Sequence, residues 1–318
     1  MPHDLCQRAA GAVVYYVSPL LERAGVRHAF TTRLGGVSPP PFDSLNLGNS
    51  STGDIQDDRR HIEANCRLIQ AAIGCLERRR CSVHQVHGSN VVTVAAGQSF
   101  GYGLKADALV CDDARSLISI RTADCVPILL ASADGRCVGA VHAGWRGVVA
   151  GIALAAVGAM RKLAGDAKLL AAIGPAIGPE AFEVGDEVLA QFENVFGSDA
   201  PLRRRPGGKG HVDMRRALKI QLSAAGIQDI DATDLCTFGL AAEFFSHRRD
   251  RGITGRMAAF IAPRRPSTSL QATPAEGLGE NSLARNRKRL PGDSVIAGGF
   301  APDSSAPIPG DATNEPGR

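Results

Sequence analysis

The stretch SLISIRTADCVPILLASADGRCVGAVHAGWRG, from Ser116 to Gly147, decides the fold. It contains three short apolar runs, SLISI, VPILLAS and RCVGAVHA, which are rich in β-branched and small residues. Runs of this length and composition are typical of buried β-strands. The sequence therefore predicts neighbouring strands in the core, with polar residues and glycines where each run ends.

Helices are predicted on the C-terminal side of these strands. Apolar residues recur at steps of three and four from Gly147 to Ala164, and Gly165 follows as a stop signal. A second helix should begin after Asp213, a plausible N-cap, and end at Gly226, and a third should cover Glu187 to Phe196. Strands and helices alternate without a regular βαβ period, which predicts an α+β fold with mixed β-sheets packed with helices in layers. The chain has neither a G-x-G-x-x-G after a strand nor a P-loop, so the sequence gives no support to dinucleotide or ATP binding.

The composition is that of an ordinary globular protein. The 318 residues are 44% hydrophobic and 21% charged, with a formal net charge of +4, which is too weak to indicate a nucleic-acid partner. From about Pro263 onward Pro, Gly, Ser and Ala dominate and apolar residues are scattered, so we expect a disordered tail. We expect one domain over residues 1–262 and the tail over 263–318. The basic run at Arg285 to Arg289 is best interpreted as a solvated part of that tail.

We expect a cytoplasmic protein with reduced cysteines. The N-terminus has no charged leader followed by an apolar run and a cleavage site, and its short apolar stretch cannot cross a bilayer. The eight cysteines form no C-x-x-C pair. In a reducing compartment each is a small core residue unless it binds a metal or attacks a substrate.

Three segments could carry chemistry: VHQVHG from Val83, RTADCVP from Arg121 and VHAGWRG from Val141. Each places a histidine or cysteine beside glycine or at the end of an apolar strand, where a rigid scaffold can display it. Taken singly, such a residue is more often a packed side chain than a ligand. The separations between His87, Cys125 and His142 also match no local zinc-finger spacing.

Taken together, these segments resemble the laccase-domain proteins, also called multicopper polyphenol oxidase-like, YfiH-like or peptidoglycan editing factor-like. The resemblance runs from about His28 to Ile261. It is carried, in order, by TTRLGGVSPPPFDSLNLG, QVHG, ADALV, RTADCVPILL, HAGWRG, GPAIGPEAFEVGDEV, DLCT, FFSHRRD and TGRMAAFI. The fold of this family looks like that of some cysteine hydrolases, and its members act as purine nucleoside phosphorylases.

The resemblance implies a catalytic metal held by His87, Cys125 and His142, with zinc expected and copper possible. Such a set gives zinc three protein ligands and leaves one position for water or substrate. His84 is an alternative ligand, but it is not part of the family pattern, and we expect a surface or supporting role. Cys125 could instead be a covalent nucleophile, although a metal-bound thiolate is a poor one.

Phosphorolysis requires an anion site, for which Arg33 and Arg146 are the candidates. Arg146 should lie just before the helix that opens at Gly147, so that its guanidinium and the first free N–H groups could meet one anion. Arg33 lies in a loop flanked by glycines. Either arginine could equally pair with a buried carboxylate. Arg248 and Arg249 in FFSHRRD are further candidates for the anion site. Asp124 and Glu183 could be general acids, general bases or groups that orient the site, or equally buried hydrogen-bond partners.

The function implied by the resemblance is a zinc-dependent purine nucleoside phosphorylase acting on adenosine, inosine and methylthioadenosine, with adenosine deaminase activity. One alternative is a hydrolase that removes misincorporated serine from peptidoglycan precursors, and another is a binding module with a structural metal. A copper-dependent polyphenol oxidase is disfavoured, because such an enzyme needs about ten histidines and this chain has eight. We expect small-molecule partners, no nucleic acid or membrane, and a monomer or small homo-oligomer. The preferred nucleoside and the acid that protonates the leaving base are left open.

Overall fold

The computed structural model describes residues 4–50, 55–98 and 103–265. The predicted disordered tail falls mostly on residues outside these ranges. Its first residues are described and hydrogen-bonded: Arg78 donates to the Pro263 carbonyl at 2.7 Å, and the Arg264 amide donates to the Gly135 carbonyl at 2.8 Å. The last strand is therefore followed by a short stretch that is still attached to the folded part.

The described strands form two six-stranded sheets and one three-stranded sheet. The first sheet has the order β1 (Cys6–Ala10), β2 (Val13–Val17), β3 (Arg27–Thr31), β15 (Met257–Ala262), β7 (Ser116–Thr122), β4 (Arg79–Cys81). The second has the order β14 (Ile230–Ala232), β10 (Leu169–Ile173), β8 (Val126–Ser132), β9 (Val138–Ala143), β6 (Ala108–Cys111), β5 (Val91–Val94). The third has the order β11 (Glu183–Gly185), β13 (Lys209–Val212), β12 (Leu202–Arg205). The two large sheets are mixed, because the β4–β7, β5–β6 and β10–β14 pairs are parallel and their other pairs are antiparallel.

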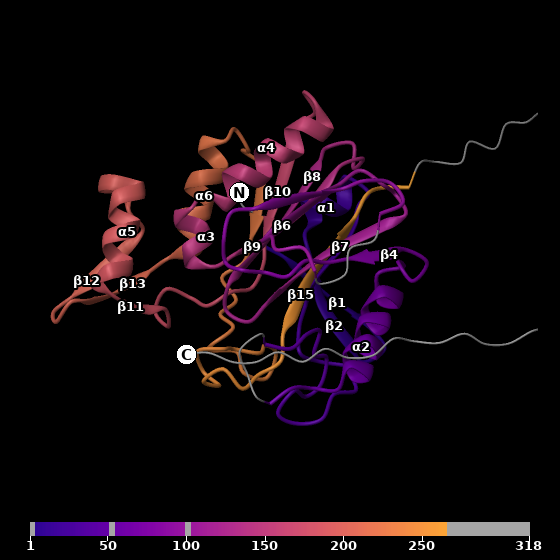
Figure 1. Cartoon of the computed structure of the whole chain (residues 1–318), viewed down its shortest axis with the longest axis horizontal. Helices are drawn as coiled ribbons and strands as arrows, with labels where there is room; N and C mark the ends of the chain where they lie inside the picture. Colours follow the sequence, from indigo (N-terminus) through magenta and orange to yellow (C-terminus); the bar gives the residue numbers. More distant parts are fainter. Residues whose placement is uncertain (1–3, 51–54, 99–102, 266–318) are drawn as a thin grey trace, which may run out of the picture. The chain divides into compact units, whose positions relative to one another are not determined.

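The two large sheets pack face to face, as the alternation along their strands shows. Ile118 and Ile120 of β7 point into the same apolar cluster as Leu129 and Ala131 of β8. Successive strand residues point to opposite faces, so Leu117 points the other way, toward the cluster that contains buried residues of α2 (Arg59–Ala72). The layers are therefore α2, the first sheet, the second sheet and a group of helices (Figure 1).

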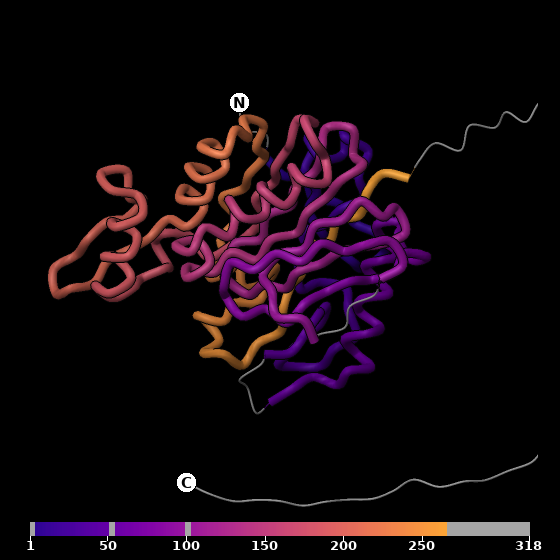
Figure 2. Tube along the Cα trace, turned by 45° about the horizontal axis from the view of Figure 1, so that its top comes forward, coloured from indigo at the N-terminus to yellow at the C-terminus, as the bar shows by residue number. Residues whose placement is uncertain are grey.

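Helices cover the outer face of the second sheet. Val126, Ile128 and Leu130 of β8 lie in one cluster with residues of α4 (Ile152–Ala164) and α6 (Met214–Ala224). The remaining helices are α1 (Pro19–Arg23), α3 (Trp145–Val149), α5 (Asp186–Phe196) and the 3₁₀ turn η1 (Gly197–Asp199). In both views α5 and the third sheet lie at one end of the part formed by the described residues, beyond α3 (Figures 1 and 2). This architecture confirms the predicted α+β fold with mixed sheets and helices in layers.

Most predicted elements are present, and one is wrong in detail. The Asp213 side chain caps α6 by accepting from the Arg216 amide at 3.0 Å, as the N-cap prediction requires. The helix predicted from Gly147 to Ala164 is instead two helices, α3 and α4, separated at Gly151. Gly151 has φ +77°, which a right-handed helix cannot contain, so the chain turns there and starts again.

The helices give no sign of a membrane span. Among the residues that the structure describes, no helix is both long enough and apolar enough to cross a bilayer.

Candidate metal centre

The structure brings His87, Cys125 and His142 together. One ligand atom of each residue lies within 4.8 Å of the others, and within the described ranges these three residues form the one such group of possible metal ligands. The two imidazole rings meet edge to face, with centroids 4.8 Å apart and planes 76° apart. His142 is buried, Cys125 is partly buried and His87 is exposed, so the cluster opens toward solvent on the side of His87.

The β8–β9 pair explains how two of the three residues meet. In this antiparallel pair Pro127 lies opposite His142 and Val126 lies opposite Ala143. Cys125 comes directly before β8, so the pairing brings it to the end of β9 where His142 lies. A separation of 17 residues, from 125 to 142, thus becomes a contact because the chain makes a hairpin.

Asp107 attaches both histidines to the second sheet. Its carboxylate is fully buried and accepts Nδ1–H of His142 at 2.8 Å. It also accepts the backbone amides of Val86, His87 and Gly88 at 3.3, 2.9 and 2.7 Å. With Nδ1 occupied, Nε2 of His142 is the nitrogen left for a metal, as in the carboxylate–histidine pairs of known metal sites. Sequence reasoning missed this residue, although it lies in the quoted ADALV segment.

Close packing at Gly144 leaves no room for a larger residue. A Cβ atom there would lie 2.7 Å from Cδ2 of His87 and 3.2 Å from Sγ of Cys125. His87 itself has φ 60°, in the left-handed region that non-glycine residues seldom adopt. Such backbone persists where the surroundings hold it, and here Asp107 accepts the amides on both sides of the strained residue.

The cluster favours a thiolate beside an imidazolium. Burial raises the pKa of Cys125, but the neighbouring His142 and His87 outweigh it and hold that pKa below its ordinary value. Burial lowers the pKa of His142, but the charge of Cys125 and the hydrogen bond to Asp107 outweigh it and hold the pKa above its ordinary value. A sulfur that is readily deprotonated is the form that binds metals.

A cavity of about 640 Å³ opens over the cluster. This volume falls in the range of small-molecule sites, roughly 300–1,000 Å³. Besides the three cluster residues, the polar and charged side chains that line it come from several distant segments: Asn49, Ser50, His84, Gln85, Arg121, Thr122, His247 and Arg256. The sequence analysis did not single out Arg121, His247 and Arg256. No local sequence pattern shows that their side chains line a cavity formed by distant segments of the chain.

Asp124, next to Cys125, is a buried hydrogen-bond acceptor. Its carboxylate accepts the hydroxyls of Thr237 and Ser246 at 2.7 and 3.0 Å, and the Arg248 amide at 2.7 Å. Asp124 also has φ 85°. These bonds fix the backbone from which Cys125 projects, so Asp124 supports the shape of the loop.

The predicted anion-binding arginines lie elsewhere. Neither Arg33 nor Arg146 lines the cavity. Arg33 forms an ion pair with Asp43 at 3.1 Å and lies over the Phe245 ring. Arg146 does not precede its helix but is the second residue of α3, exposed and stacked on Trp145. The structure gives both guanidinium groups other partners, and their role with phosphate stays a prediction.

The other candidates divide between the cavity and the surface. His84 lines the cavity but is not in the three-residue cluster. Glu183 pairs with Lys209 at 3.1 Å, and its carbonyl accepts from Arg248 at 2.9 Å. Arg249 pairs with Asp250 at 2.8 Å.

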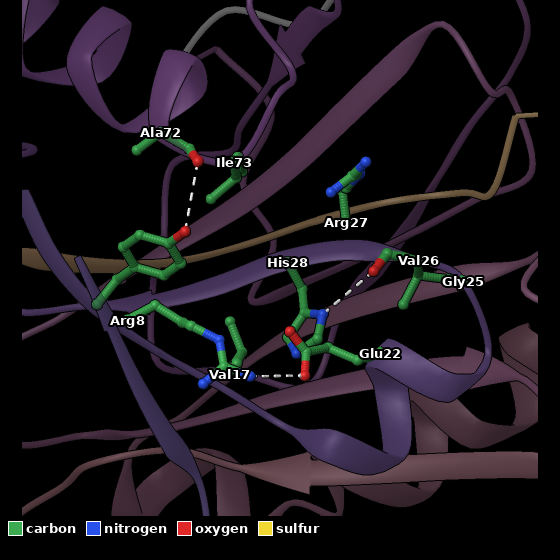
Figure 3. Close-up of a pocket in the computed structure, with 10 residues that line it drawn as sticks. Arg8, Val17, Glu22, Gly25, Val26, Arg27, His28, Ala72 and Ile73 are labelled. Atoms are coloured by element: carbon green, nitrogen blue, oxygen red, sulfur yellow. Dashed lines mark hydrogen bonds and ion pairs between the residues drawn. The ribbon is translucent and has the colours of Figure 1, made fainter. Parts of the chain in front are cut away.

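A second cavity, of about 380 Å³, lies between β1, β2, β3, α1 and α2 (Figure 3). The side chains of Arg8, Tyr15, Glu22 and His28 in its lining bind one another or the backbone. Arg8 pairs with Glu22, Tyr15 donates to the Ala72 carbonyl, and His28 contacts the Val26 carbonyl at 3.3 Å. Nε2 of His28 accepts the Ser18 amide at 2.8 Å, so both ring nitrogens are used within the fold.

Comparison with known proteins agrees with the fold and the motifs. Residues 27–264 match the family model described as multi-copper polyphenol oxidoreductase laccase. The chain is 40% identical over 258 residues to a protein of Deinococcus radiodurans named purine nucleoside phosphorylase, covering 80% of this chain and 97% of that protein. It is 39% identical over 237 residues to purine nucleoside phosphorylase YfiH of Escherichia coli K12, covering 74% of this chain and 93% of that protein. The crystal structure of YlmD from Geobacillus stearothermophilus superimposes with a TM-score of 0.74 at 35% identity, covering 83% of this chain and all of that one.

Proposed function

Because the chain belongs to the multi-copper polyphenol oxidoreductase laccase family, we propose that it is a zinc-dependent purine nucleoside phosphorylase with adenosine deaminase activity. Its substrates are adenosine, inosine and S-methyl-5′-thioadenosine together with phosphate, and its products are the free base and the phosphorylated sugar. The names of the relatives support the reaction class, and the site supports the metal.

The observation that carries the proposal is the convergence of His87, Cys125 and His142 in the lining of a cavity large enough for a small molecule. Two imidazoles and one sulfur are ligands that zinc prefers, and a set of three protein ligands is typical of catalytic zinc sites. Asp107 presents Nε2 of His142 to the cluster, which is what a metal there requires. Copper also accepts these donors, so the metal has to be measured.

His87, Cys125 and His142 would hold the metal, and the burial of His142 would keep bulk water from that side of it. When bound, zinc supplies a Lewis acid that polarises an oxygen or lowers the pKa of a water molecule. Cys125 contributes a thiolate, Asp107 keeps His142 in one tautomer, and Gly144 lets His87 approach the sulfur. In phosphorolysis a phosphate oxygen bonds to C1′ of the ribose, the bond from C1′ to the base breaks, and the base leaves with a proton.

Deamination uses the same cavity without phosphate. An oxygen from water replaces the amino group at C6 of adenine, and ammonia leaves. This activity rests on the ability of a bound metal to activate water, and it predicts that conversion of adenosine to inosine is independent of phosphate.

The test is metal analysis of the purified protein, followed by chromatography of inosine incubated with and without phosphate. We expect about one zinc per chain and hypoxanthine that appears only with phosphate. Cys125→Ala should lose metal and turnover together, whereas Cys6→Ala, a change of the same kind in the edge strand β1, should keep both.

Three results would reject the proposal. Turnover by Cys125→Ala without bound metal would remove the cluster from the reaction. Release of serine from a UDP-muramoyl-serine substrate, without any phosphorolysis, would instead favour the peptidoglycan-editing hydrolase. Bound copper with oxygen consumption on a phenol would favour the oxidase.

The same proposal includes the expected setting of the enzyme. We propose a cytoplasmic protein with one catalytic domain over residues 1–262, acting as a monomer or small homo-oligomer without nucleic-acid or membrane partners. Size-exclusion chromatography with light scattering tests the oligomeric part.

A further inference from the structure

Two arginines lie side by side where the first sheet reaches the cavity. Arg121 is in β7, opposite Ala258 of β15, and Arg256 comes two residues before Ala258. Arg256 directly precedes β15, and it lies close enough to Arg121 for the two positive charges to interact. Both line the cavity that contains the His87–Cys125–His142 cluster.

Hydrogen bonds attach the backbone of Arg256 to the loop that follows Leu45. Its amide donates to Oδ1 of Asn46 at 2.8 Å, and its carbonyl accepts the Leu47 amide at 2.9 Å. Its Nη1 donates to the carbonyls of Thr254 and Gly255, both at 3.1 Å. In the described parts of the chain, no carboxylate forms an ion pair with this guanidinium.

Arg256 is partly buried, and the positive charge of Arg121 acts on it from close by. Burial lowers the pKa of Arg256 and the neighbouring Arg121 lowers it further, whereas the negative charges of Cys125 and Asp124 oppose these effects without outweighing them. Buried charges are normally paired. Arginine also presents donors that match the oxygens of phosphate.

Gly48 sets the position of Arg121. A Cβ atom on Gly48 would lie 2.6 Å from Cδ and 2.8 Å from Nη1 of Arg121, so the side chain lies directly on the glycine backbone. The backbone of Arg121 is fixed as well, because its amide donates to Oε1 of Gln85 at 2.8 Å and its carbonyl accepts from Nε2 of Gln85 at 2.7 Å. Gln85 lies two residues before His87, so its hydrogen bonds connect the backbone of Arg121 to the segment that contributes His87 to the cluster.

We propose that Arg121 and Arg256 bind the inorganic phosphate that attacks the nucleoside, at the wall of the cavity next to the three-residue cluster. The inference rests on the proposed phosphorylase function and assigns its second substrate to a pair of residues other than Arg33 and Arg146. In the reaction an oxygen of HPO₄²⁻ forms a bond to C1′, and the bond between C1′ and the base breaks. The electron pair of that broken bond goes to the base, which also receives the proton of the phosphate. The two arginines bind the phosphate oxygens and orient one of them toward the sugar.

The experiment compares steady-state kinetics of inosine phosphorolysis in Arg121→Met, Arg256→Met and Gly48→Ala with the full-length wild type. We expect the KM for phosphate to rise at least tenfold in the two methionine variants and severalfold in Gly48→Ala, which moves Arg121 without removing its charge. The KM for inosine should change less than twofold and the zinc content should not change. Arg136→Met, which removes an exposed arginine that pairs with Asp134, should resemble the wild type.

A binding measurement separates this inference from the proposed function. Inorganic phosphate should raise the Tm of the wild type and of Arg146→Met, and should have no such effect on Arg121→Met or Arg256→Met. If phosphate raises the wild-type Tm in this way but no nucleoside is cleaved, the phosphorylase proposal fails and the anion site stands. If Arg146→Met or Arg33→Met loses the phosphate effect while both cavity variants keep it, or if phosphate does not affect the wild type, the assignment is wrong.

Discussion

His142 and His28 are equally buried, at 3% exposure each, yet their surroundings favour opposite charges. His28 meets only backbone: it accepts the Ser18 amide and contacts the Val26 carbonyl, and burial lowers its pKa to about 4. His142 meets a carboxylate and a sulfur, which together outweigh its burial and raise its pKa. The comparison teaches that burial alone produces a neutral structural histidine, whereas a histidine placed between Asp107 and Cys125 is arranged for binding.

Each histidine also has a buried aspartate nearby, and the two aspartates act differently. Asp107 accepts directly from the His142 ring. Asp231 accepts from the Ser18 hydroxyl at 2.6 Å and the Leu20 amide at 2.9 Å, and its charge acts on His28 too weakly to offset burial. The pair Asp107 and Asp231 therefore offers matched variants with different expected consequences.

The largest predicted effect is the pH dependence that His28 gives to stability. Its pKa is lower in the folded state than the ordinary 6.5, so the unfolded state binds more protons between about pH 6.5 and 4. Stability from this residue is thus complete above pH 6.5 and is lost as the pH falls toward 4, by about 3 kcal/mol. Urea unfolding of the wild type and His28→Gln across this range measures it. If the free energy of unfolding depends on pH in the same way in both proteins, His28 is not the source of the pH dependence.

A second prediction concerns Asp107→Asn. The amide keeps the shape of the side chain but loses the negative charge and one acceptor oxygen, so metal affinity should fall by about 10- to 100-fold. Chelator competition followed by metal analysis measures the change. Asp231→Asn is the matched control and should leave metal affinity as in the wild type. Equal losses in both variants would mean that general destabilisation, not support of His142, is responsible.

The smallest of the three predicted effects is that of Gly144→Ala. The added methyl group would overlap Cδ2 of His87, so the imidazole has to move and turnover should fall by roughly tenfold or more. Gly158→Ala in α4 has open space around the new methyl group and serves as the control. Wild-type kinetics in Gly144→Ala would show that the position of His87 does not matter.

The sequence predicted the layers well because their signals are local. The runs in β7, β8 and β9 are mostly apolar, and the structure buries nearly all of their residues between the sheets or beneath the helices. The split at Gly151 was missed because apolar spacing continues through it, and only the backbone conformation of that one residue separates α3 from α4.

The site was predicted only in part, because its supporting contacts are distant in the chain. His87, Cys125 and His142 came from a family resemblance, and their spacing alone did not identify them. The role of Asp107 depends on amides at residues 86–88 and a ring at residue 142, which no local pattern connects. Arg121 and Arg256 become neighbours only through the β7–β15 register, whereas Arg33 and Arg146, chosen for nearby glycines and a helix start, lie outside the cavity.

X-ray absorption at the metal edge of the purified enzyme tests the central claim most directly. The account predicts zinc with one sulfur at about 2.3 Å and two imidazole nitrogens at about 2.0–2.1 Å, and loss of the sulfur shell in Cys125→Ala. A wild-type spectrum without sulfur, or one that Cys125→Ala leaves unchanged, would contradict it.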